Sequence, residues 1–188
     1  MLNAISDRLA GRAAMLSGAS LIAGGVTQIV HSQRNAGDKV VGVPGHLTVG
    51  FFVVSLICMA PSFIALARYA RPGIARKAAV AAAAGTLALG ATATTSLIAG
   101  HDLSLFTVMA PLTNALWLFG ALVLAVSLKR AGCVPTWVAV GLPLAWAATI
   151  ILATLGGGVL SGAYYLSVGL LLAGGAIQRV PQPASVRA

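Results

Sequence analysis

Three histidines and two acids are the side chains of this sequence best suited to chemistry. His31 and His46 enclose a polar stretch that contains Asp38, and His101 is followed directly by Asp102. Imidazole and carboxylate groups together can ligate zinc, copper or iron, and a histidine can also hold haem or donate protons to a quinone. Apolar sequence surrounds these groups, so their relative positions depend on how the apolar segments fold.

The composition predicts an integral membrane protein. Of 188 residues, 59% are hydrophobic and 8% are charged, whereas soluble domains carry about 25% charged residues. A soluble chain of this length would need much more charged surface to stay monomeric. We therefore expect an all-α integral membrane protein.

Six apolar segments are each close to the roughly 20 residues that a helix needs to cross a bilayer. Short polar connections or glycine turns separate them, and no room remains for a separate soluble domain. Residues 1–12 are expected to form a cytoplasmic interfacial segment, and residues 179–188 a cytoplasmic tail. The predicted six-helix transmembrane domain is 13–178, with spans at about 13–31, 47–67, 78–100, 104–128, 135–155 and 159–178.

The basic residues predict the orientation of these spans. With a cytoplasmic N-terminus, ten of the 12 lysines and arginines lie inside, and only Arg34 and Lys39 lie outside. Short loops are the setting in which this asymmetry sets topology. Both termini are therefore expected in the cytoplasm. The net charge of +9 is then explained by topology and by anionic lipid headgroups, and no nucleic-acid partner is expected.

This orientation places all three histidines at the outer surface, above a set of polar residues in the outer halves of the spans. Gln28 precedes His31 by three residues and shares a helix face with it. Such a distribution is typical of a polar vestibule open to the outside. The candidate ligand-binding residues are Gln28, His31, His46, Thr95, His101, Asp102, Asn114 and Tyr164.

Three interpretations of the histidines stay open. His31, His46 and His101 could together hold a metal ion, but their separations of 15 and 55 residues match no compact metal motif. They could serve haem or quinone chemistry, although haem ligands in helical bundles usually lie within the helices. They could also simply mark the membrane interface, where amphipathic side chains are comfortable.

Most enzyme classes lack their residues in this sequence. It contains no glutamate and its aspartates are far apart, which excludes paired-carboxylate chemistry. It also lacks the nucleophile-elbow, zinc-protease and Walker A motifs. The sequence therefore leans away from an enzyme.

Small residues predict where helices approach closely. The segment 78–100 is rich in alanine, glycine and threonine, and its stripe Ala82, Thr86, Gly90 and Thr94 repeats every four residues. In lipid, close backbone approach drives helix association. We expect this segment at the bundle centre, with a leucine at Gly90 more damaging than an alanine at Leu124.

The sequence thus predicts a multi-pass protein of a bacterial plasma membrane. Its expected function is to bind or pass a small ligand through the outward-facing vestibule, or to act as a membrane subunit. Its expected partners are the lipid bilayer and either further copies of itself or a partner membrane subunit. The alternative is a membrane-embedded enzyme or redox protein whose histidine cluster holds a metal or cofactor.

Overall fold

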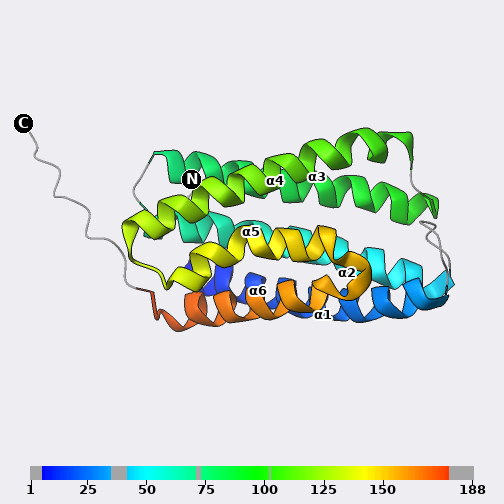
Figure 1. Ribbon diagram of the computed structural model, residues 1–188, viewed down its shortest axis with the longest axis horizontal. Helices are drawn as coiled ribbons and strands as arrows, with labels where there is room; N and C mark the ends of the chain where they lie inside the picture. The colour runs from blue at the N-terminus through cyan, green and yellow to red at the C-terminus, as the bar shows by residue number, and fades with distance from the viewer. Residues whose placement is uncertain (1–5, 35–41, 71–72, 102, 178–188) are drawn as a thin grey trace, which may run out of the picture.

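The computed structural model describes residues 6–34, 42–70, 73–101 and 103–177. These residues form six α-helices, two short 3₁₀ turns and no strand, which confirms the predicted all-α class (Figure 1). Five of the α-helices are long and apolar enough to cross a membrane. The elements are α1 (Asp7–Arg34), α2 (Gly42–Leu66), η1 (Ala67–Tyr69), α3 (Ile74–Ala99), α4 (Ser104–Ala131), α5 (Thr136–Ile151), η2 (Ala153–Leu155) and α6 (Gly157–Gly174).

The helices run up and down along one axis and close into a ring. Each helix packs against its neighbours in sequence, and α1 packs against α6. In Figure 1, α3 and α4 lie along the top, α1 and α6 along the bottom, and α2 and α5 between them. One end of the bundle, here named the Asp7 end, holds the start of α1 and the end of α6. The opposite end, which carries His31, His46 and His101, is named the histidine end.

Two helix pairs are held by backbones in direct contact. At Gly162 of α6, an added Cβ would lie 2.5 Å from the carbonyl oxygen of Gly18 in α1. At Gly120 of α4, it would lie 2.5 Å from the backbone nitrogen of Ala82 in α3. Only glycine permits such an approach, and the resulting dispersion contacts are what hold helices together in lipid.

Gly85, rather than Gly90, is the glycine of α3 at which the neighbouring helix leaves no room for a Cβ atom. A Cβ at Gly85 would lie 2.7 Å from the backbone nitrogen of Trp117, whereas a Cβ at Gly90 would meet Leu56 at an ordinary 3.5 Å. More of α3 is buried than of any other long helix. Ala82 of the expected stripe lies against α4, whereas Gly90 is buried against Leu56 of α2. The expected ranking of the Gly90 and Leu124 substitutions stays a prediction.

Two expected segments differ in extent from the observed helices. α1 runs without a break from Asp7 to Arg34, so residues 7–12 continue the first long helix. Gly11 seats this first part against Gly169 and Ala173 of α6. α5 has only 16 residues, about 24 Å of helix, and the chain then turns through η2 before α6 begins. The expected span 135–155 is therefore a short helix plus a turn.

Candidate functional site

A cavity of about 240 Å³ lies in the half of the bundle nearer the histidine end and is partly open to the surroundings. α1 and α2 form one side of it, and the α5–α6 turn forms the other. The lining residues are Ser20, Leu21, Gly24, Gly25, Gln28, Thr48, Val49, Phe52, Thr149, Ile150, Ala153 and Gly158.

Because α5 is short, one side of the cavity is formed by a turn and the other by two long helices. α5 ends at Ile151, and η2, which follows it, packs against α1. Gly25 of α1 lies directly against the backbone of Val159 in α6. On the opposite wall, the hydroxyl groups of Thr48 and Thr27 lie 2.9 Å apart and join α2 to α1. The cavity is the space left between these two contacts.

Two of the four polar side chains in the walls, Thr48 and Thr149, are already hydrogen-bonded within the bundle. The Thr48 hydroxyl lies 2.8 Å from the carbonyl oxygen of Pro44. The Thr149 hydroxyl lies 2.8 Å from both the carbonyl oxygen of Ala145 and the hydroxyl of Ser161. These contacts fix the wall residues in one arrangement, which preorganises the cavity.

Two polar side chains in the wall remain free to meet a ligand. Within the described residues, neither the half-buried carboxamide of Gln28 nor the buried hydroxyl of Ser20 has a hydrogen-bond partner. A carboxamide can donate two hydrogen bonds and accept two. The Gln28 carboxamide therefore has the largest unused hydrogen-bonding capacity in the wall.

Of the predicted site residues, Gln28 lies in the cavity wall. His31 follows one helical turn later, with an exposed fraction of 8% and an Nδ1 atom that has no partner in the described part of the chain. His46 and His101 are exposed, and their Nδ1 atoms donate locally, to Gly42 at 2.8 Å and to Ala99 at 3.0 Å. Asp102 lies outside the described residues.

The three histidines share one end of the bundle but form no metal centre within the described residues. No three histidine, cysteine or acidic side chains there lie close enough together to hold a metal ion. Asp38 and Asp102 fall outside that search. The metal and redox interpretations therefore stay predictions to which the described geometry adds no support.

The remaining predicted residues make contacts within the bundle. The Thr95 hydroxyl donates to the carbonyl of Thr92 in its own helix at 2.6 Å. Asn114 in α4 donates to Ala110 at 2.9 Å and accepts a hydrogen bond from the indole of Trp146 in α5 at 3.2 Å. The Tyr164 hydroxyl donates to the carbonyl of Val138 at 2.7 Å, which ties α6 to α5. None of the three belongs to the cavity wall.

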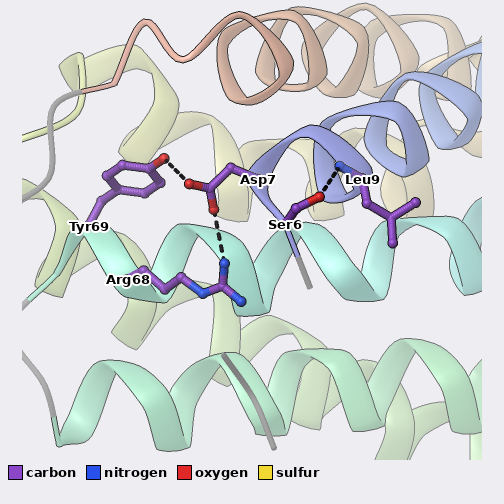
Figure 2. A network of polar contacts seen from close by, with 5 residues as sticks. All are labelled: Ser6, Asp7, Leu9, Arg68 and Tyr69. Carbon is purple, nitrogen blue, oxygen red and sulfur yellow. Dashed lines mark hydrogen bonds and ion pairs between the residues drawn. The ribbon is translucent and has the colours of Figure 1, made fainter. Parts of the chain in front are cut away.

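The Asp7 end is closed by an ionic contact (Figure 2). The Asp7 carboxylate accepts from the Arg68 guanidinium at 3.0 Å and from the Tyr69 hydroxyl at 3.1 Å. The Ser6 hydroxyl accepts the Leu9 N–H at 3.1 Å and so caps the start of α1. This contact joins the first turn of α1 to η1, which follows α2, far from the cavity.

The polar groups of the cavity wall are hydroxyls and one carboxamide. Among the described residues the wall contains no carboxylate, imidazole, thiol or cationic side chain, so its serine and threonine hydroxyls have no general base beside them there. It does offer apolar surface with a few placed polar groups, which is the usual make-up of a small-molecule site.

Sequence reasoning found Gln28 but missed its companions in the wall. Ser20, Thr48 and Thr149 are ordinary hydroxyl residues in apolar segments, and only the packing of α1, α2 and α5 shows that they meet. Comparisons with protein-family models, with curated proteins and with solved structures gave no match for this chain.

Proposed function

We propose that this protein is a six-span plasma-membrane bundle with both ends in the cytoplasm, which binds a small ligand from the outer side through the cavity beside Gln28. Basic residues support the orientation. The described side chains at the Asp7 end include seven lysines and arginines, and short-loop charge of this kind sets topology. They are Arg8, Arg12, Arg68, Arg76, Lys77, Lys129 and Arg130.

The observation that carries the proposal is the position of the cavity. It lies only in the half toward the histidine end, whereas Phe63 and Tyr69, nearer the Asp7 end, are almost wholly buried. A ligand can thus enter from the outer side and meets a packed core below. In this reading α5 crosses the bilayer as a short helix, and local thinning of the lipid or the η2 turn compensates for its length.

Site-directed thiol labelling tests this arrangement. The background variant carries Cys58→Ser and Cys133→Ser, and Val49→Cys then places one thiol in the cavity wall. A thiol reacts as the thiolate, which needs water. We expect a small, membrane-impermeant methanethiosulfonate added outside intact cells to modify Val49→Cys. Ser62→Cys, at a wholly buried position of the same helix, should stay unmodified.

Two results would overturn the proposal. One is labelling of Val49→Cys only when the reagent reaches the cytoplasmic side. The other is equal labelling of Val49→Cys and Ser62→Cys, since the bundle would then be either permeable along its length or closed at both levels.

A further inference from the structure

The side chains that line the cavity indicate whether its ligand carries a charge. Among the described residues, none that lines the cavity carries a charge. The described ion pair, Asp7 with Arg68, lies at the opposite end of the bundle. Moving an ionised group out of water is strongly unfavourable unless an opposite charge or several hydrogen bonds meet it. A charged ligand would find no opposite charge among the described lining residues, and only the Gln28 carboxamide and the Ser20 hydroxyl would be left to replace its hydration.

The polar groups of the wall fix where the head of a ligand would lie. Gln28 is nearer the histidine end and Ser20 is nearer the middle of α1, eight positions earlier, or about 12 Å along the helix. Leu21, Val49 and Phe52 supply apolar surface to the wall. A ligand with a polar head at Gln28 would therefore extend an apolar body toward Ser20.

The structure points to an uncharged amphiphile as the ligand: an apolar body about as long as an eight-carbon chain, with one amide, carbonyl or hydroxyl group that pairs with the Gln28 carboxamide. This inference rests on the proposed function, because it names the ligand class of the same cavity. An unpaired polar group in a site gives selectivity, since a ligand that cannot satisfy it leaves it desolvated.

Protection of the cavity thiol measures this preference directly. The probes share one apolar body and differ in the head: octanamide, octane, octanoate and octylammonium. The protein, with Val49→Cys in the cysteine-free background, is reconstituted in nanodiscs and alkylated with N-ethylmaleimide. We expect octanamide to slow alkylation at least fivefold and octane to slow it less. Octanoate and octylammonium should leave the rate unchanged at equal membrane concentration.

Three further variants identify the site. Gln28→Leu should reduce the protection given by octanamide to that given by octane, because the amide head group loses its hydrogen-bond partner. Ala153→Leu should fill the cavity and abolish protection by every probe. Ala84→Leu adds the same side chain at an exposed position of α3 and should leave protection intact.

The outcomes separate this inference from the proposal on which it rests. The inference of an uncharged amphiphile is overturned if a charged probe protects the thiol as well as octanamide does, or if octanamide does not protect it. Labelling of Val49→Cys from outside would still support an outward-facing cavity in either case. Protection that persists in Ala153→Leu also overturns it, because the probe then acts elsewhere. Absence of outside labelling removes the proposed function itself.

Discussion

The two halves of this bundle bury different kinds of side chain. Toward the Asp7 end, the interior is filled by large apolar and aromatic groups such as Phe63, Tyr69 and Leu128. Toward the histidine end, buried positions are held by small polar residues such as Thr92 and by the cavity. We name the first region the plug and the second the chamber. A second hollow, lined by residues 6–8 and 172–175, lies between the start of α1 and the end of α6.

This difference shows how a helical bundle can hold a cavity without losing its fold. Threonine and serine can donate to carbonyls of their own helix, as Thr92 does to Leu89 at 2.9 Å, so they are satisfied without a partner helix. Such residues leave space where leucine would fill it. Stability then comes from the plug and from the backbone contacts of α1 with α6 and of α3 with α4.

The largest expected effect comes from truncating one phenylalanine in each half. Phe63 is fully buried and meets the Tyr165 ring edge-on at 6.5 Å, whereas Phe52 is half-buried in the cavity wall. Phe63→Ala should cost about 3 kcal/mol or more, since it opens a void in close packing. Phe52→Ala enlarges a space that is already open and should cost about 1 kcal/mol or less.

Thermal unfolding of both variants in the same detergent measures this contrast. An equal fall in melting temperature would mean that the two halves are packed alike. The distinction between plug and chamber would then be lost.

The sequence was informative about the helices because six apolar runs are separated by polar or glycine-rich breaks. It erred in detail at α5, where Leu152 and Leu155 continue the apolar run although the helix has ended. Hydropathy cannot distinguish an apolar turn from a helix. The Gly156–Gly158 turn was visible, but its depth depends on the contact of Gly25 with Val159.

The cavity was predictable only in part for a related reason. Helices that are apolar on all sides give no hydrophobic face, so their sequences do not say which residues meet. Gln28 could be found because an amide in such a segment is rare. Val49 and Ile150 could not, because each looks like any residue that faces lipid. The same limit explains why Gly90 was chosen over Gly85.

A smaller effect is expected from the contact that closes the plug. Asp7→Asn keeps the shape of the side chain but removes the charge that Arg68 meets at 3.0 Å. Hydrogen bonds to charged groups contribute about 1.5–3 kcal/mol when well shielded, and both side chains here are partly exposed, at 16% and 18%. We expect a loss of about 1 kcal/mol.

Arg8→Gln is the control, since it also removes one charge beside Asp7 but from an exposed side chain. The melting temperature should fall for Asp7→Asn and stay unchanged for Arg8→Gln. Added salt should lower the melting temperature of the parent protein slightly and that of Asp7→Asn hardly at all. A fall of the same size in both variants would indicate a general charge effect rather than a specific contact.

The smallest effect concerns the polar contacts that hold α5 in the chamber half. Thr149→Val keeps the side-chain shape and removes the hydroxyl that links α5 to Ser161 of α6 at 2.8 Å. Hydrogen bonds between membrane helices contribute about 0.6 kcal/mol on average, and Ser161 keeps its own bond to the Ala145 carbonyl at 2.8 Å.

The matched control is Thr94→Val, because the Thr94 hydroxyl donates only within α3, to Gly90 at 2.8 Å. We expect Thr149→Val to lower the melting temperature by a degree or two, and Thr94→Val to leave it unchanged. If Thr149→Val changes the labelling rate of Val49→Cys but leaves the melting temperature unchanged, this hydrogen bond sets the width of the cavity rather than the stability of the fold. Equal behaviour of the two valine variants would mean that packing alone holds α5 against α6.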